Sequence, residues 1–323
     1  MFRAPLVLIL AGGCNAVFGL DVQEYHPVAC GPYGVPVPVV FTDAVAGARD
    51  ASFDEAGVHG LVVVGTNATI LPVIQTAPDT FALDPARMGG LTALQTTGNL
   101  RTAHITAAPN HLIPSGLLDP KIAADMFGAV RPTAGNDLEV DHFNFSTATK
   151  VWSFAEGTTV DAVQDVSVYP GNELELATDA PTLFTRYLSV VRVDAALTHT
   201  VDVDQRLPAD ANWHLQKVGT DPATLAINGV HSVQQAVIAL GTLPTATVEA
   251  HPLTLIYSAV PLGAPAGTPA HLFVSAHTAN GFPVGTQVGV EIEDGELVEP
   301  WVNASCTTLW FRRGDTVYRA DSL

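Results

Sequence analysis

Short runs of apolar residues, either alternating with polar ones or continuous, cover most of the chain and are rich in β-branched side chains. Gly, Pro, Asn and Asp separate these runs, a pattern that is typical of β-strands joined by turns. The predicted strands cover residues 35–41, 61–65, 68–76, 137–145, 159–169, 173–177, 188–206, 247–260, 270–277, 286–293 and 307–318.

Turn and helix signals lie between these strands. Asp294-Gly295 follows an alternating run and supplies the positive φ angles of a tight hairpin turn. Aspartate precedes proline at 84–85, 119–120 and 221–222, an arrangement that favours a helix start. We predict short helices over 119–128 and over 232–240, the second ending before Gly241.

Many strands with few helices predict a mainly β fold, a sandwich or jelly-roll-like barrel with a few short connecting helices. No low-complexity linker divides the chain, so residues 21–323 are expected to form a single large β-rich domain. The first residues, MFRAPLVLILAGGC, resemble a signal peptide with a lipid-attachment cysteine. Their apolar stretch is at the lower limit of about 7 residues, and Ala11 stands where a lipoprotein box has an aliphatic residue. We therefore expect residues 1–20 to form an ordered strand or arm.

Charge changes the picture of the surface. Charged residues make up 14% of the chain, against about 25% in an ordinary globular domain, so we expect much of the surface to be covered by other subunits. The net charge is −18, with lysine only at positions 121, 150 and 217. Without a basic patch, direct nucleic-acid binding is not expected, and no apolar run is long enough to predict a membrane span.

The three cysteines, Cys14, Cys30 and Cys306, show no metal-ligand spacing. A chain of 323 residues does not need a covalent staple, so buried free thiols are expected, although one disulfide with one free thiol stays possible.

Sequence motifs for nucleotide binding, a nucleophile elbow or a zinc protease are absent. His199 would point away from Asp202 and Asp204 on a strand, which argues against a metal site there. Paired carboxylates that could act on a sugar occur in one acidic stretch, where a charged hairpin tip is the favoured interpretation. The stretch contains Glu291, Glu293, Asp294, Glu296 and Glu299. The sequence therefore predicts no catalytic residues, no cofactor, no metal and no enzyme.

Arg313, Gly314 and Asp315 spell the tripeptide RGD between two strand-like segments. The tripeptide resembles the cell-attachment sequence of integrin ligands, which implies a possible receptor-binding turn. Arg-Gly-Asp is also favourable turn chemistry in its own right.

In general character the chain resembles viral capsid structural proteins, being poor in charge and rich in strand. That resemblance implies a structural subunit of a virus particle, in a minor, cementing, triplex-like or outer-shell role rather than a genome-binding one. Its partners would be copies of itself and other capsid proteins in the virion. The alternatives are a secreted or surface-anchored β-sandwich binding protein or adhesin, and a phage tail or baseplate component. A glycan hydrolase on a β scaffold comes last.

Overall fold

The computed structural model describes most of the chain after the first 29 residues. The described residues are 30–54, 56–65, 69–98, 100–105, 122–130, 138–160, 163–175, 183–193, 199–206, 216–217, 225–239, 254–276, 281–290, 295–303 and 306–323.

The described strands form five separate sheets, which we call blades 1 to 5 in chain order. Blade 1 contains β3 (Ala48–Phe53), β4 (His59–Val64), β5 (Thr69–Ala77) and β6 (Thr80–Leu83), with β2 (Val40–Phe41) parallel to β6. Blade 2 contains β7 (Leu100–Ile105), β8 (Ile122–Val130), β9 (Leu138–Ser146) and β10 (Trp152–Val160). Blade 3 contains β11 (Val163–Glu175), β12 (Leu183–Val193), β13 (His199–Arg206) and β14 (Gln216–Lys217). Blade 4 contains β15 (His231–Ala239), β16 (Thr254–Pro261), β17 (His271–Ala276) and β18 (Thr286–Gln287). Blade 5 contains β19 (Leu297–Val302), β20 (Thr308–Arg313), β21 (Thr316–Asp321) and β1 (Val37–Pro38).

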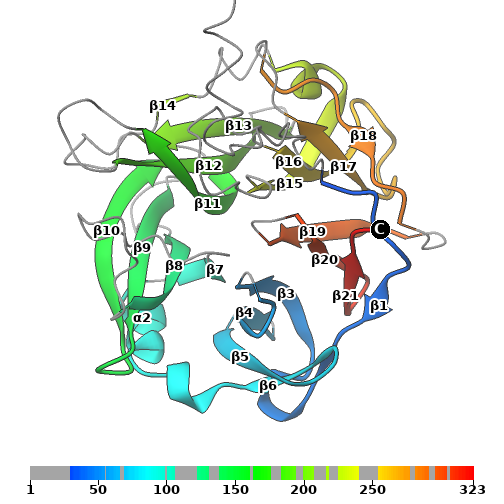
Figure 1. Cartoon of the computed structure of the whole chain (residues 1–323). Coiled ribbons are helices and arrows are strands. Elements are labelled where there is room, and N and C mark those ends of the chain that lie inside the picture. Colours follow the sequence, from blue (N-terminus) through cyan, green and yellow to red (C-terminus); the bar gives the residue numbers. More distant parts are fainter. Residues whose placement is uncertain are drawn as a thin grey trace, which may run out of the picture.

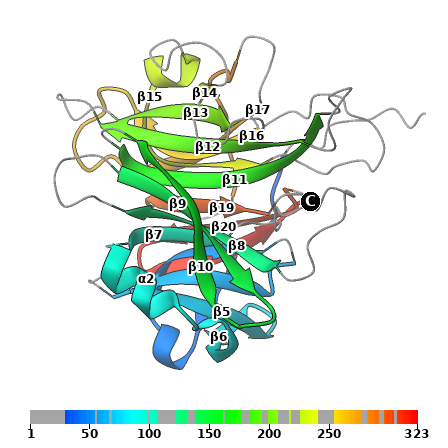
Figure 2. The same ribbon diagram turned by 90° about the vertical axis from the view of Figure 1, so that its left-hand side faces the viewer.

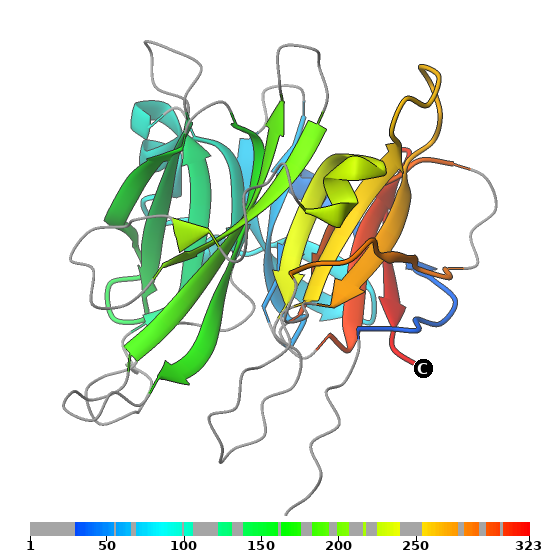
Figure 3. The same cartoon turned by 90° about the horizontal axis from the view of Figure 1, so that it is seen from above.

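The five blades form a closed ring, as Figure 1 shows. The first strand of each blade is innermost, and these strands contact one another in the cyclic order β3, β7, β11, β15, β19 and back to β3. The four strands that follow one another in blades 1 to 4, and the last three strands of blade 5, form an antiparallel meander. The chain therefore leaves each blade at the outside of the ring and enters the next at the inside. In the side views the strands run between two opposite faces of the ring (Figures 2 and 3). This arrangement is a five-bladed β-propeller.

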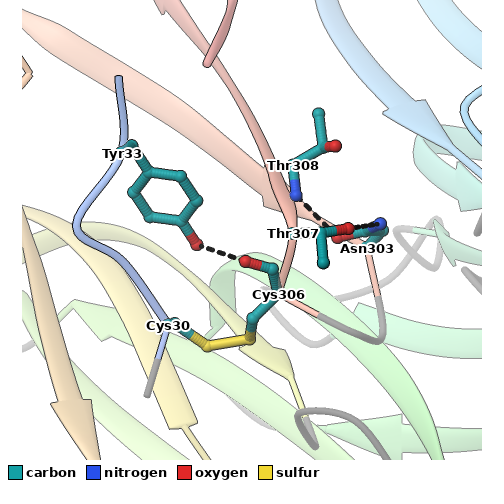
Figure 4. Close-up of a disulfide and its surroundings, with 6 residues drawn as sticks. All are labelled: Cys30, Tyr33, Asn303, Cys306, Thr307 and Thr308. Atoms are coloured by element: carbon teal, nitrogen blue, oxygen red, sulfur yellow. Dashed lines mark hydrogen bonds between the residues drawn. A yellow bond between two sulfur atoms is a disulfide. The ribbon is translucent and has the colours of Figure 1, made fainter. Parts of the chain in front are cut away.

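The ring is closed by the two ends of the described chain. Strand β1 pairs with β21, so a segment near the N-terminus completes the C-terminal blade. A disulfide joins Cys30 to Cys306, and the Tyr33 hydroxyl donates a hydrogen bond of 3.3 Å to the Cys306 carbonyl, as Figure 4 shows. The prediction of free thiols was therefore wrong for this pair.

Short helices connect the strands. They are η1 (Asp43–Val45), η2 (Pro85–Arg87), α2 (Leu91–Gly98) and η4 (Ala226–Gly229). The helix signal at Asp84 is confirmed, because its side chain accepts the Ala86 N–H at 3.0 Å and caps η2. Helix α2 lies beside blade 2 in Figure 2 and contacts β5 and β7. The site at 221–222 lies outside the described residues.

The two longer helix predictions were wrong. Residues 122–130 form strand β8, and residues 231–239 form strand β15. In β15 the buried Val233 and Val237 contribute to two apolar clusters, so packing between blades overrides a local sequence that also suits a helix.

The described strands on either side of Asp294-Gly295 do not pair with each other as the predicted hairpin requires. Strand β18 ends at Gln287 and pairs with β17 in blade 4, whereas β19 begins blade 5 and pairs with β20. The described part of this segment therefore connects two blades, and Asp294 itself lies outside the described residues.

The mainly β prediction is confirmed. The sandwich or jelly-roll arrangement is not what the described strands form, because the apolar faces pack between five sheets around a ring instead of between two. The predicted arm at 1–20 lies outside the described residues. None of the helices in the described ranges is long and apolar enough to cross a membrane.

Candidate active site

All five innermost strands carry a β-bulge close to their first residue. Between two successive residue pairs, the innermost strand contains one more residue than the neighbouring strand does. The irregularities lie between Ala48 and Asp50, Leu100 and Thr102, Val163 and Asp165, Val233 and Gln235, and Val298 and Trp301. Because every blade is an antiparallel meander, the innermost strands run in one direction and the bulges lie at the same face of the ring. We call it the bulge face.

Bulges re-aim side chains and are common next to active sites. At the bulge face they bring together residues from three neighbouring innermost strands. Gln235 of β15 accepts the backbone N–H of Glu299 of β19 through its Oε1 at 2.5 Å. Asp50 of β3 is close enough for its negative charge to act on Glu299. We call Asp50, Gln235, Glu299 and Arg312 the central cluster.

The backbone at Glu299 explains why β19 bulges here. Glu299 has a φ of 54°, which is unusual for a residue with a side chain. The next residue is Pro300, which has no N–H to give to the sheet and is found at bulges and edge strands. The bulge turns the Glu299 N–H away from β20, and this N–H donates its hydrogen bond to the Gln235 side chain instead.

Arg312, from β20, holds the Glu299 carboxylate with two hydrogen bonds. Its Nε lies 2.5 Å from Oε2 and its Nη2 lies 3.1 Å from Oε1. Its Nη1 donates to the Gly314 carbonyl at 2.6 Å. The Arg312 and Glu299 side chains are 24% and 16% exposed, so this fork is largely removed from water.

The two carboxyl groups titrate near neutral pH. Burial raises the pKa of Asp50 to about 6, against the opposing charges of Arg312 and Arg49 and the Ala51 backbone N–H. Burial raises the pKa of Glu299 to about 7, and the negative charge of Asp50 raises it as well, against its bonds to Arg312. Burial would lower the pKa of Arg312, but the Glu299 carboxylate raises it above its usual value.

Two neighbouring carboxyls of this kind titrate together, because the protonation of one changes the pKa of the other. Near pH 6 to 7 the pair holds one proton between two positions, so one carboxyl can donate a proton while the other is an anion. This is the electrostatic arrangement of an acid–base catalyst.

From the sequence, Glu299 was predicted only as part of a charged hairpin tip, and Asp50 was not predicted as a functional residue. Of the other acidic residues in that stretch, Glu296 is exposed, and Glu291, Glu293 and Asp294 lie outside the described residues. A usable signal was present in two places, the Arg49-Asp50 pair inside an otherwise small and apolar run and the Glu299-Pro300 step inside a strand.

The RGD tripeptide forms the turn between β20 and β21. Arg313 pairs with Thr316, so Gly314 and Asp315 are the two turn residues, and both are exposed. Gly314 has a φ of 56°, as a tight hairpin of this length requires at its first central residue. The turn lies at the bulge face, because Arg313 pairs with Leu297, the first residue of β19. Its use in receptor binding stays a prediction.

His199, Asp202 and Asp204 lie in β13 of blade 3 and are not part of the central cluster. Within the described ranges, no group of three or more His, Cys, Asp or Glu residues is placed to hold a metal ion.

No protein-family model matches the chain, and no curated protein sequence matches it. Solved structures with a similar course of the chain include a GH43 endo-arabinanase from Bacillus licheniformis, at 11% identity and a TM-score of 0.48, covering 85% of this chain and 93% of that one. A mannose phosphorylase from Leishmania mexicana matches at 12% identity and a TM-score of 0.47, covering 95% and 91%. A GH62 hydrolase in complex with xylotriose matches at 10% identity and a TM-score of 0.48, covering 90% and 96%.

These matches correct the expectation of a viral capsid subunit without enzymatic activity, because the proteins matched are enzymes that act on carbohydrates and not capsid proteins. The similarity is limited to the overall path of the backbone. The central cluster, and not the likeness, carries the reaction proposed below.

Proposed function

We propose that the chain is an enzyme that cleaves a glycosidic bond by acid–base catalysis at the bulge face, with Asp50 and Glu299 as the catalytic carboxyls. The observation that carries the proposal is the coupled pair itself, two adjacent carboxyls on the innermost strands of the first and last blades with pKa values raised to about 6 and about 7. Cleavage of a glycosidic bond needs two such groups and no nucleophilic serine, cysteine or metal.

In this reaction the protonated carboxyl of the pair donates its proton to the oxygen of the leaving sugar. In the same step the ionised carboxyl acts on the opposite side of the bond. It either attacks the sugar carbon, forming a covalent glycosyl ester that water then hydrolyses, or takes a proton from the water molecule that attacks that carbon. Arg312 is a positioning residue, since it fixes the orientation of Glu299, and the Gln235 side chain fixes the bulged backbone that presents it.

We also propose that the protein works outside the reducing cytosol, as a secreted or cell-surface protein. The Cys30–Cys306 disulfide supports this compartment, because structural disulfides persist mainly in oxidising surroundings.

The test is hydrolysis of a panel of 4-nitrophenyl glycosides of the common pentoses and hexoses, together with release of reducing ends from plant, fungal and bacterial polysaccharides. The wild-type chain should cleave at least one of these, with a pH profile that changes between about 6 and about 7. Asp50→Asn and Glu299→Gln should each lower kcat/KM by about 100-fold or more.

Asp315→Asn is the matched control, because Asp315 is an exposed acid of the same blade, and its activity should equal that of the wild type. Melting temperatures of all variants separate loss of catalysis from loss of folding. Full activity in both Asp50→Asn and Glu299→Gln, or no cleavage of any substrate by well-folded wild-type protein, would overturn the proposal.

A further inference from the structure

A cavity of about 300 Å³ lies between blades 1 and 2, on elements that do not contribute to the central cluster. One side is formed by β4, β5 and the segment that contains η2, and the other by the end of β9 and the turn that leads into β10. The lining residues are His59, Ile74, Asp84, Ala86, Arg87, Phe145, Thr147 and Lys150.

The two sides of this cavity are fixed to each other by backbone contacts. Gly89 forms a parallel bridge with Val151, and the Trp152 indole Nε1–H donates to the Arg87 carbonyl at 2.9 Å. The approach is so close that a Cβ on Gly89 would lie 2.1 Å from the Lys150 carbonyl oxygen. The cavity is therefore built by fixed elements, which favours a preformed binding site.

Arg87 is the most unusual residue in the lining. Its side chain is 11% exposed, its Nε lies 3.7 Å from Asp84 Oδ2, and its guanidinium carbon lies 5.5 Å from the centre of the Phe145 ring. Its Nη1 is buried and has no hydrogen-bond partner among the described residues. A buried cationic donor without an acceptor is costly, and burial here also lowers the pKa of the guanidinium.

Asp84 does not supply the missing acceptor. Its Oδ1 accepts the Ala86 N–H at 3.0 Å, and its Oδ2 lies 3.2 Å from His59 Nδ1 as well as facing Arg87 Nε. Lys150 adds a second positive charge to the lining. The polar part of the cavity is thus formed by a guanidinium that lacks one acceptor and by an excess of basic groups, whereas Ile74, Ala86 and Phe145 form an apolar part.

We propose that this cavity binds a small organic carboxylate with a compact apolar body. The carboxylate pairs with the Arg87 guanidinium and with Lys150, and the apolar body packs on Ile74, Ala86 and Phe145. A guanidinium and a carboxylate form one of the stronger charge-assisted contacts in proteins, and an apolar surround strengthens it further. This inference does not depend on the glycosidase proposal, because it concerns other residues and requires no catalysis.

The test is isothermal titration calorimetry of the full chain with three probes. Benzoate carries a carboxylate on a compact apolar body, benzyl alcohol has a similar body without the charge, and inorganic phosphate has charge without the body. Benzoate should bind at one saturable site, and both other probes should bind at least about 10-fold more weakly.

Two substitutions remove the groups that the proposal invokes. Lys150→Gln and Arg87→Met should each weaken benzoate binding by about 10-fold to 100-fold. Lys150 is exposed, so its substitution keeps the test decisive if Arg87→Met does not fold. Arg49→Gln removes an exposed basic residue outside the cavity and should leave benzoate binding unchanged.

Four results would overturn the proposal. They are the absence of saturable benzoate binding, equal binding of benzyl alcohol, tighter binding of phosphate than of benzoate, and unchanged benzoate affinity in Lys150→Gln. In the first case the cavity holds water only. Calorimetry needs no substrate turnover, so failure here and failure of the glycosidase proposal are separate results.

Discussion

The negative charge of Asp50, in the first blade, raises the pKa of Glu299, in the last. The two residues are far apart in sequence and meet only because β19 and β3 are neighbours where the ring closes. A functional site of this kind depends on closure of the propeller, so the same contacts that stabilise the ring also position the catalytic pair.

The first prediction concerns the pH dependence of stability. Unfolded Asp and Glu titrate near pH 3.9 and 4.3, whereas Asp50 and Glu299 titrate at about 6 and about 7 in the folded chain. Between about pH 4 and about pH 7 the folded state therefore holds more protons at these two sites than the unfolded state. Their contribution to the free energy of unfolding is greatest below pH 4 and is lost as pH rises, by about 1.4 kcal/mol per pH unit for each extra proton.

Asp50→Asn removes one of the two groups and the charge that raises the pKa of the other. Compared with the wild type, this variant should lose less stability between about pH 4.5 and about pH 7.5, as measured by urea denaturation at several pH values. Asp315→Asn provides the comparison, because its exposed carboxylate should leave the wild-type slope unchanged. A slope in Asp50→Asn as steep as in the wild type would show that Asp50 does not titrate with a raised pKa in the folded chain.

The outer parts of the blades could be predicted from the sequence better than the site could. Strands β4, β5, β17 and β20 were predicted because they are rich in continuous or alternating apolar residues, which the blade-to-blade packing buries. The innermost strands β3 and β7 were missed, and β15 was predicted as a helix. In β3 and β15 the bulges at Asp50 and Gln235 shift the alternation by one residue, so the period of two that identifies a strand is interrupted.

Ring closure was beyond sequence reasoning for a different reason. The pairing of Val37 with Arg319, like the disulfide from Cys30 to Cys306, joins opposite ends of the chain. Local propensity contains no information about such a contact, and with three cysteines the pairing has several solutions. The central cluster shares this property, since Asp50 and Glu299 meet only after the ring has closed.

The second prediction concerns the disulfide. Because Cys30–Cys306 ties the strand that completes blade 5 to the rest of that blade, Cys30→Ser should lower the free energy of unfolding by about 2 to 5 kcal/mol. Mild reduction of the wild type should have a similar effect on the melting temperature. Titration of denatured, unreduced protein with a thiol reagent should find one free thiol per chain, which is the three cysteines minus the bonded two. Three free thiols in the native protein would contradict the bond.

The third prediction concerns a hydrogen bond between the first and last blades. The Trp301 indole N–H of β19 donates to the Phe53 carbonyl at the end of β3 at 2.9 Å, and Trp301 is fully buried. Trp301→Phe leaves that carbonyl without its donor and should lower the free energy of unfolding by about 1 to 3 kcal/mol beyond the loss of ring area. Chemical denaturation gives this value directly.

Trp310→Phe is the matched comparison for Trp301. Trp310 is as deeply buried in the same blade, but its Nε1 has no hydrogen-bond partner within the described part of the chain. Its replacement removes ring area without breaking a hydrogen bond, so it should cost less than Trp301→Phe. Equal or greater destabilisation in Trp310→Phe would show that the Trp301 bond contributes little to holding β19 against β3.

The last prediction concerns the close packing of β3 on β4. A Cβ on Gly60 would lie 2.5 Å from the Ser52 carbonyl oxygen and 2.7 Å from a ring carbon of Phe53, and Gly60 pairs with Phe53 in the register. Phe53 is fully buried against Phe81 and Trp310, so its ring has no space into which to move. Gly60→Ala should therefore destabilise the chain by about 1 to 3 kcal/mol through overpacking. Gly229→Ala is the control, because a Cβ there meets nothing within 4 Å, and it should change stability by less than about 1 kcal/mol. Ser52 and Phe53 continue the strand that carries Asp50, so Gly60→Ala should also lower glycosidase activity more than Gly229→Ala does. Equal activity in the two variants would show that the position of Asp50 does not depend on the contact between Gly60 and these two residues.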